Sequence, residues 1–361
     1  MGRTPWASAG LRGAFGTMAT IGVGIAGFDH WYAGIGAADE AAQEPRCRLV
    51  AVGGVQTALT DFARERGVAF VTNDPLEVVA RPDVDVVVCA ASSDRNPALV
   101  REAAARGKAV LSVKPMAVTA AAGQALALAV RGAGIPFFPL ECQGRLQEAG
   151  RRLQAWWGRG ERFGRPISAL LVMRGSVPRQ DWPGHDVGET WWQDPMRVPG
   201  GGWIDHAIYD VDFLRWALGS EVAHVFGQVS TLKHPGLRVE DFGLATLTFA
   251  NGVIAAVEVT WHGTAGAPAG TRQFVGSRGS VLAALPQTRG WLVATEGGDA
   301  QGWQPEEPPT GRRSPLSHML DHILDGRPLA AGVADGLANL RACLAFYRSA
   351  SEGRSVAPDD V

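Results

Sequence analysis

The chain has 361 residues, of which 46% are hydrophobic, and a formal net charge of −2. This length and composition suit a globular protein with room for two domains and exclude a disordered chain. The near-neutral charge argues against nucleic acid as a partner. No apolar run reaches the roughly 18 residues needed to span a membrane, so no membrane partner is expected. The cysteines are scattered without a CxxC pair, which favours reduced thiols and a cytoplasmic location; they are Cys47, Cys89, Cys142 and Cys343.

The first 17 residues stand apart from the rest of the chain. They contain basic residues but no sustained apolar stretch, so they do not resemble a secretory signal. Met18 comes just before the first predicted strand. We therefore treat residues 1–17 as an N-terminal extension, expect it to be disordered, and leave it out of the fold prediction.

Residues 18–142 alternate between short apolar strands and helical segments. The strands are expected at 20–27, 47–54, 84–91, 109–113 and 135–140. Helices are expected between them, at 31–43, 57–66, 75–80, 95–106 and 119–132. This alternation is typical of a parallel sheet covered on both faces, so it predicts a doubly wound, dinucleotide-binding Rossmann domain.

Residues 143–361 change character. After a helix near 144–158, strands follow one another from about residue 166 to residue 296, and Asn251-Gly252 signals a hairpin between two of them. Two helices, near 316–325 and 333–352, end the chain. The pattern predicts an α+β domain for substrate binding and oligomerisation, built on a large, mostly antiparallel open sheet. The Trp-, Pro- and Gly-rich segment 176–199 is expected to be a loop over a site.

Two positions are open for the glycine-rich turn that holds a cofactor's phosphates. Gly22, Gly24 and Gly27 match GxGxxG literally, but the turn should follow the first strand, with the second strand ending about 20 residues later. Spacing favours a turn that starts at Gly27, with Asp29 in the second glycine position. A carboxylate there would repel a diphosphate unless it turns away or is paired. The residues expected to contact the cofactor in this turn are Gly27, Phe28, Asp29 and His30.

Two further strand ends contribute to the expected cofactor site. The second strand runs into Gly54, where many dinucleotide-binding proteins carry an acidic residue that holds the ribose. Since no acid is present there, the sequence does not separate NAD from NADP, and either is expected as cofactor. Ala91 and Ser92, which follow the third predicted strand, are expected at the same edge.

Residues 200–216, GGGWIDHAIYDVDFLRW, join a glycine turn to a helix. Asp205 and Tyr209 are four residues apart and share one face of that helix, and Asp212 lies near the same face. Such a face can line a pocket. The alternative is an ordinary amphipathic helix with an acidic first turn.

In the order and spacing of several stretches, the chain resembles the glucose–fructose oxidoreductase/inositol dehydrogenase (Gfo/Idh/MocA) family. The stretches are VDVVVCAASSDRNPALVREAAARGKAVLSVKPMAVT (84–119), ERFGRPISALLVMRG (161–175) and WWQDPMRVPGGGWIDHAIYDVDFLRWALG (191–219). The resemblance implies a dinucleotide domain followed by an open-sheet domain. It also implies oxidation or reduction of a hydroxyl on sugars, cyclitols and related compounds.

The resemblance also implies which residues line the reaction site. The family's lysine and proline are matched by Lys114 and Pro115, but Val113 replaces the preceding acid. Of the later motif, Asp205 and Asp212 match, while Tyr209 stands where the usual base histidine would be. His206 is present but lies about 100° round the helix from Asp205.

These residues suggest a division of labour in hydride transfer from an alcohol. Lys114, at the carboxyl edge of the sheet, is expected to hold the reacting oxygen and stabilise its negative charge. Tyr209 is expected to carry the proton, with its pKa lowered by a nearby ammonium, although a pocket-wall tyrosine is the equal alternative. Asp205 is expected to orient Tyr209 or to bind substrate hydroxyls. Substrate contacts are further expected from His206 and Trp192, because aromatic faces suit sugar rings.

The sequence thus predicts an NAD(P)-dependent oxidoreductase acting on a sugar-like or cyclitol-like hydroxyl. No metal site is expected, because His318 and His322, four residues apart, lack a third ligand nearby. One alternative is bond cleavage through transient oxidation with a retained nicotinamide. Another is a non-catalytic binding protein with a degenerate cofactor turn. Since one face of the open sheet needs cover, a homo-oligomer, dimer or tetramer, is expected.

Overall fold

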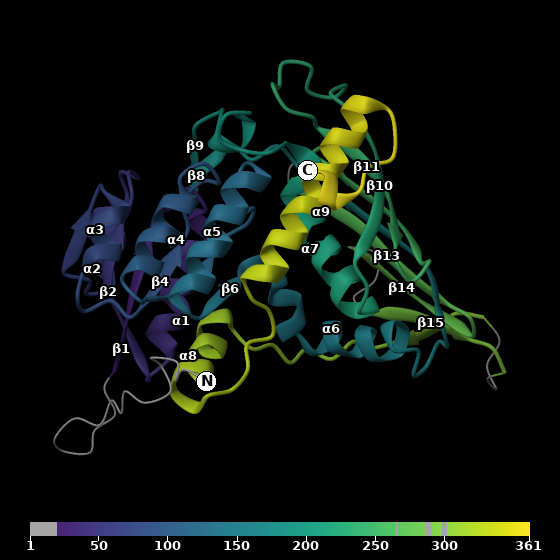
Figure 1. The fold of residues 1–361 in the computed structure, drawn as a ribbon, viewed down its shortest axis with the longest axis horizontal. Coiled ribbons are helices and arrows are strands. Elements are labelled where there is room, and N and C mark those ends of the chain that lie inside the picture. The colour runs from purple at the N-terminus through teal and green to yellow at the C-terminus, as the bar shows by residue number, and fades with distance from the viewer. Residues whose placement is uncertain (1–19, 265, 286–289, 298–301) are drawn as a thin grey trace.

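The computed structural model of the protein describes residues 20–264, 266–285, 290–297 and 302–361. The expected extension, residues 1–17, lies outside the described residues. Two sheets with helices between and around them make up the described chain (Figure 1). Within it, no helix is long and apolar enough to cross a membrane.

The first sheet has six parallel strands in the order β3-β2-β1-β4-β5-β6. This is the doubly wound arrangement that the strand–helix alternation predicts. One strand, β3, was missing from the prediction, because its three residues are only half-buried and give a weak apolar signal. The strands are β1 (Ile21–Ala26), β2 (Cys47–Gly53), β3 (Phe70–Thr72), β4 (Val86–Cys89), β5 (Ala109–Ser112) and β6 (Phe137–Pro139).

Helices cover both faces of this sheet. One face packs against α1 (Trp31–Gln43) and α2 (Leu59–Glu65). The other packs against α3 (Pro75–Ala80), α4 (Asn96–Ala105) and α5 (Ala120–Ala133). Several helix ends have residues that are typical of helix caps. The side chains of Asp74 and Thr119 cap the N-termini of α3 and α5, and Gly134 ends α5 in a left-handed conformation.

The second sheet has eight strands in the order β10-β11-β12-β7-β13-β14-β15-β16. All neighbours are antiparallel except β12 and β7, so the expectation of a mostly antiparallel sheet is confirmed. Its strands are β7 (Pro166–Arg174), β10 (Val222–Ser230), β11 (Phe242–Phe249), β12 (Ile254–Thr260), β13 (Ala269–Gly276), β14 (Gly279–Leu285), β15 (Trp291–Thr295) and β16 (Gln304–Glu306).

The chain between the two sheets is mainly helical. The link from β6 comprises η2 (Leu140–Leu146), α6 (Glu148–Leu153) and η3 (Gln154–Gly158). The segment between β7 and α7 (Gly202–Leu218) is not a plain loop, because it holds the small hairpin β8 (Gln180–Trp182) and β9 (His185–Asp186) and the turn η4 (Trp191–Gln193). The apolar face of α7 packs on the second sheet.

The last helices connect the two halves. In α9 (Val333–Glu352), Val333 and Leu337 join the core of the first sheet, while Phe346 joins the core of the second. The preceding α8 (Pro315–Asp325) returns to the first sheet, where Leu316 and Met319 pack beside α1. The final turn is η5 (Pro358–Asp360). In Figure 1, α7 and α9 lie between the two sheets.

Candidate functional site

The turn after β1 starts at Gly27, which confirms the position that spacing favours. Gly22 and Gly24 lie inside β1, where an added Cβ would overlap Asp83 and Val78. Gly27 has φ +92°, and a Cβ there would lie 2.7 Å from the amide nitrogen of Ala91. Only glycine therefore fits where the turn passes the end of β4.

Asp29, in the second glycine position, is paired rather than free. Its Oδ2 accepts a hydrogen bond of 2.8 Å from the amide of Ser92. Arg197 lies 3.6 Å and Arg95 3.9 Å from the same carboxylate. Arg197 also donates to the hydroxyl of Ser92, at 2.7 Å. The expected repulsion of a diphosphate is thus reduced by two guanidinium groups.

Segment 176–199 covers this turn, as expected of a loop over a site. Trp191 donates from Nε1 to the carbonyl of Asp29, at 3.0 Å, and Trp182 packs against Phe28 with ring centroids 5.7 Å apart. Gly27 and Phe28 are consequently buried. Figure 1 shows β8 and β9 over the edge of the first sheet opposite the start of β1.

The backbone beneath this cover fits the phosphates of a dinucleotide. Among the described residues no side chain caps the N-terminus of α1, and the helix dipole favours an anion there. At the end of β2, Gly54 is followed by Val55 and Gln56, and the buried Oε1 of Gln56 has no hydrogen-bond partner among the described residues.

Lys114 lies just past β5 and reaches into the space between the two halves of the protein. Its Nζ donates to the carbonyl and, at 2.8 Å, to Oδ1 of Asp205. The same Nζ lies 4.3 Å from the ring centroid of Trp192 and 5.3 Å from that of Tyr209. The structure therefore brings together Lys114, Asp205, Tyr209 and Trp192, and the adjoining Lys114–Pro115 bond is cis.

Asp205 is held by three partners. Besides Lys114, Trp261 donates from Nε1 to Oδ2 at 3.1 Å, and Nδ1 of His206 lies 3.2 Å from Oδ2. Burial alone would raise the pKa of Asp205, but Lys114 and His206 hold it well below its usual range. Asp205 is therefore an anion at neutral pH. Trp261, at the end of β12, was missed by sequence reasoning because no local pattern links it to α7.

The expectation that an ammonium lowers the pKa of Tyr209 is wrong. Burial raises the pKa of Tyr209, and the nearby Asp205 raises it further. Lys114 does not reverse this, because its charge is already paired with Asp205. The Tyr209 hydroxyl thus keeps its proton at neutral pH. The side chain of His206 is about half exposed, at 45%, and contacts this centre through Asp205.

His30 is a neutral imidazole at the same centre. Burial and the charge of Lys114 lower the pKa of His30 to about 3. Its Nδ1–H donates to the carbonyl of Ala91 at 3.2 Å, while Nε2 is buried with no hydrogen-bond partner among the described residues. Trp191 and Trp192 pack against the ring, with centroids 4.8 and 5.4 Å away.

A cavity of about 230 Å³ adjoins these side chains. Lys114, Tyr209 and His30 line one end of it, and Glu40 and Arg312 line the other. Small residues along α1 line this space, namely Ala33, Gly36 and Ala37, and their spacing is the sequence signal for it.

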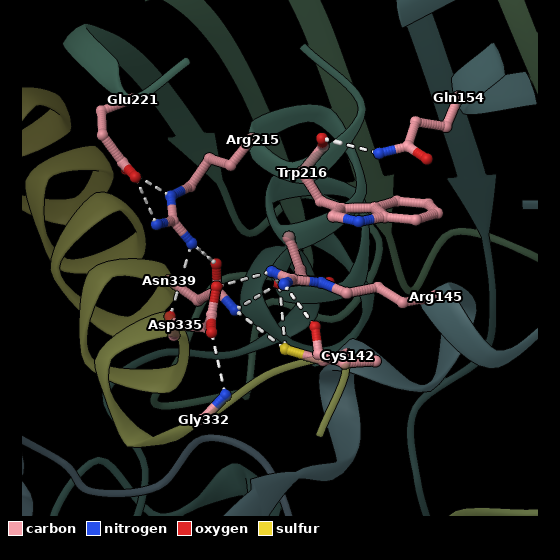
Figure 2. A network of polar contacts seen from close by, with 11 residues as sticks. Cys142, Arg145, Gln154, Arg215, Trp216, Glu221, Gly332, Asp335 and Asn339 are labelled. Atoms are coloured by element: carbon pink, nitrogen blue, oxygen red, sulfur yellow. Dashed lines mark hydrogen bonds and ion pairs between the residues drawn. The ribbon is translucent and has the colours of Figure 1, made fainter. Parts of the chain in front are cut away.

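Asp212, which the family resemblance implies beside Asp205, belongs to a different cluster. Its two oxygens accept from Arg145 at 2.5 and 3.1 Å, and Oδ1 also accepts from Asn339 and Cys142. Figure 2 shows this network between η2, α7 and α9, with Asp335 and Arg215 at its margin. The pairing with Arg145 occupies Asp212, so it takes no part in the centre around Lys114.

Comparisons with known proteins agree with this architecture. Residues 17–139 match the family described as "Oxidoreductase family, NAD-binding Rossmann fold", and residues 161–282 match "GFO/IDH/MocA C-terminal domain". Together the two matches span well over half of the chain.

Similar proteins have related descriptions. The NAD(+)-dependent scyllo-inositol 2-dehydrogenase of Bacillus subtilis (strain 168) is 26% identical over 73% of this chain and 72% of its own length. The 1,5-anhydro-D-fructose reductase of Ensifer adhaerens is 26% identical over 84% of this chain and 91% of its own. The structure of GenD2 from gentamicin A biosynthesis, in complex with NAD, is 25% identical with a TM-score of 0.77, covering 94% of this chain and 96% of that one.

Proposed function

Because the chain belongs to the Gfo/Idh/MocA family of NAD-binding oxidoreductases, we propose that it transfers a hydride between NAD or NADP and a hydroxyl-bearing carbon. The substrate is a sugar-like or cyclitol-like alcohol or the corresponding ketone. The observation that carries this proposal is the buried Lys114–Asp205 pair beside the hydroxyl of Tyr209. The described relatives, an inositol dehydrogenase and a sugar reductase, support the substrate class.

The bound nicotinamide supplies the hydride acceptor or donor, so that oxidation converts alcohol and NAD(P)⁺ into ketone, NAD(P)H and a proton. Gly27 and the first amides of α1 would hold its diphosphate, and Arg197, which pairs with Asp29 and Asp94, lies beside this turn. Ser92 and Lys114 stand beside the expected path of the cofactor along the carboxyl edge.

Lys114 is suited to hold the reacting oxygen. An ammonium group has three N–H donors, and Asp205 accepts two of them through its carbonyl and carboxylate. The third remains for a substrate oxygen, whose developing negative charge it stabilises. The carboxylate of Asp205 in turn fixes the position of the ammonium.

Tyr209 is suited to donate a proton. The hydroxyl keeps its proton at neutral pH. It would pass that proton to the alkoxide that forms as the hydride arrives at carbon, because an alkoxide is a stronger base than a phenolate. Trp192 closes the other side of the Lys114 ammonium and is itself stacked on Trp191, with ring centroids 4.3 Å apart.

Location and assembly are further parts of the proposal. A cytoplasmic location is supported by the four cysteines, which are all buried and unpaired. A homo-oligomer is supported by the second sheet, whose face away from α7 exposes Leu170, Phe226 and Ile254. Light scattering of the purified protein measures the assembly, and a monomer at all concentrations would exclude it.

The proposal is tested by titrating NADH and NADPH into the protein and following nicotinamide fluorescence. Saturable binding is expected, followed by NAD(P)⁺ reduction with scyllo-inositol, myo-inositol or D-glucose, or by NADH oxidation with 1,5-anhydro-D-fructose. If neither cofactor binds at millimolar concentration, the oxidoreductase proposal fails, and a non-catalytic binding protein is the remaining alternative.

A further inference from the structure

Gln56, which follows β2, places its side-chain amide against the backbone of Gly54. A Cβ added at Gly54 would lie 2.7 Å from Oε1 of Gln56 and 3.4 Å from the amide nitrogen of Phe28. Oε1 of Gln56 therefore occupies the space into which a side chain at position 54 would project. Many dinucleotide-binding proteins carry their ribose-holding acid at the end of this strand, so here a residue of the following loop stands in its place.

The backbone fixes Gln56 beside the glycine turn. The carbonyl of Gln56 accepts from the amide of Leu59 at 3.1 Å, which holds the residue at the start of α2. The carbonyl of Gly53, the last residue of β2, accepts from the amide of Gly27 at 2.7 Å. The end of β2 is thus joined directly to the turn that is suited to a diphosphate, and Gln56 lies at the same edge of the sheet.

The side-chain oxygen of Gln56 is an unused hydrogen-bond acceptor. Oε1 is buried and has no partner among the described residues. Buried polar atoms in proteins nearly always have a hydrogen-bond partner, so one without a partner calls for an explanation. A ligand hydroxyl would supply the missing donor, and the adenosine ribose of NAD carries a 2′- and a 3′-hydroxyl.

The acidic residues that follow the neighbouring strand β3 already have partners within the protein. Asp74 caps α3 by accepting from the amide of Leu76 at 2.9 Å. Glu77 accepts from the hydroxyl of Thr72 at 2.5 Å. Of these side chains, Gln56 is therefore the one that offers a buried acceptor without a partner among the described residues.

An amide differs from a carboxylate in charge. Its oxygen accepts a hydrogen bond from a ribose hydroxyl as a carboxylate oxygen would, and its nitrogen donates. A carboxylate also repels the 2′-phosphate by which NADP differs from NAD, whereas a neutral amide does not. A glutamine at this place can therefore hold the ribose without excluding NADP.

We propose that Gln56 holds the adenosine ribose of the dinucleotide in place of the missing acid at position 54, and that its neutral amide admits both NAD and NADP. This inference rests on the proposed function for dinucleotide binding alone. It names the residue that sets how little the protein distinguishes the two cofactors.

The test changes the charge of this side chain and then removes it. Gln56→Glu keeps its shape and introduces a carboxylate, while Gln56→Ala removes the acceptor. Gln43→Glu, the same substitution at the exposed C-terminal end of α1, is the matched control. NADH and NADPH are titrated into each protein and followed by nicotinamide fluorescence, which measures binding without turnover, and urea unfolding checks that each variant is folded.

We expect Gln56→Glu to weaken NADPH binding at least about tenfold relative to NADH binding, because the new carboxylate meets the 2′-phosphate. Gln56→Ala should weaken NADH binding at least about threefold, since the ribose loses an acceptor. Gln43→Glu should leave both dissociation constants unchanged. The proposal is overturned if Gln56→Glu does not change the ratio of the two dissociation constants, if Gln43→Glu changes it equally, or if Gln56→Ala binds NADH normally.

The two proposals fail in different ways. If both cofactors bind and the substitutions at Gln56 change neither affinity, the role of Gln56 falls and the oxidoreductase function stands. If the substitutions act as expected and no alcohol is oxidised, the role of Gln56 stands and the hydride transfer falls. If neither cofactor binds the unmodified protein, both proposals fall together.

Discussion

Two buried aspartates on α7, Asp205 and Asp212, lie two helical turns apart and are both paired with a cation from the first half of the chain. The oxygens of Asp212 receive four hydrogen bonds from Arg145, Asn339 and Cys142. Around Asp205, by contrast, the Lys114 ammonium retains a free donor and faces a cavity. A match to a family motif therefore does not by itself distinguish the two aspartates. The hydrogen-bond donors that each ion pair leaves unused do distinguish them.

The largest expected effect is a loss of stability when the Arg145–Asp212 pair is broken. Arg145→Met leaves the buried Asp212 carboxylate without its cation and also removes the bonds to Ala330 and Asp335. Breaking a buried ion pair from one side costs about 3–5 kcal/mol, so the free energy of unfolding in urea should fall by that amount. Arg159→Met, which breaks the exposed pair with Glu161, is the control and should cost less than about 1 kcal/mol. Equal losses in the two variants would contradict the structural role of Arg145.

The next largest effect is expected on turnover rather than on the free energy of unfolding. Tyr209→Phe removes one hydroxyl and little packing, so it should lower turnover about 100-fold or more, the scale of a general acid or base. Cofactor affinity should stay nearly unchanged. His206→Ala is the comparison, because the half-exposed His206 lies at the edge of the centre, against Asp205 and Tyr209, and should matter less. If His206→Ala abolishes turnover while Tyr209→Phe is near normal, His206 is the proton carrier instead.

Glu141, between the two centres, forms no ion pair with any of the described residues. Neither oxygen has a hydrogen-bond partner among the described residues, and burial, with Asp212 nearby, raises the pKa of Glu141 to about 8. Below its ordinary pKa of 4.5, both the folded and the unfolded state carry the proton, so burial costs no ionisation energy. From there toward pH 8 the unfolded state ionises first, and stability is lost at up to about 1.4 kcal/mol per pH unit.

Glu141→Gln removes this loss. The variant should match the unmodified protein in urea unfolding near pH 5 and be the more stable of the two near pH 8. A variant that is equally or less stable near pH 8 would show that Glu141 has an ionic partner in the folded protein.

The smallest expected effect is the preference between cofactors. Gly54 at the end of β2 offers no carboxylate to hold a ribose or repel a 2′-phosphate. The dissociation constants of NADH and NADPH, measured by fluorescence, should differ by less than about 100-fold, or about 2.7 kcal/mol. A larger preference for NADH would mean that an acidic residue elsewhere selects the cofactor.

Much of the fold was predictable because apolar periodicity is local. The limits of α1 and α9 agree with the prediction residue for residue, and Gly27 was identified from spacing alone. Sequence reasoning failed where the signal was weak or long-range. It missed the short strand β3, the contact of Trp261 with Asp205 across the second sheet, and the cavity along α1.

The prediction for the pKa of Tyr209 was wrong for a related reason. Its proximity to Lys114 was correctly inferred from the motif, but the effect of that ammonium depends on its own partner. Asp205 already pairs with it, so burial decides the direction of the shift. Which group pairs with the ammonium is set by tertiary structure and leaves no pattern in the sequence.

The most direct test of the contrast between the two aspartates is Lys114→Met, assayed for dinucleotide affinity, unfolding and turnover. The account predicts a folded protein that binds NADH with near-normal affinity, because Asp205 keeps His206 and Trp261 as partners. Its turnover of the identified alcohol should fall at least about 100-fold, since the donor to the reacting oxygen is gone. Turnover within a few-fold of the unmodified protein would contradict the account, because Lys114 would then be as structural as Arg145.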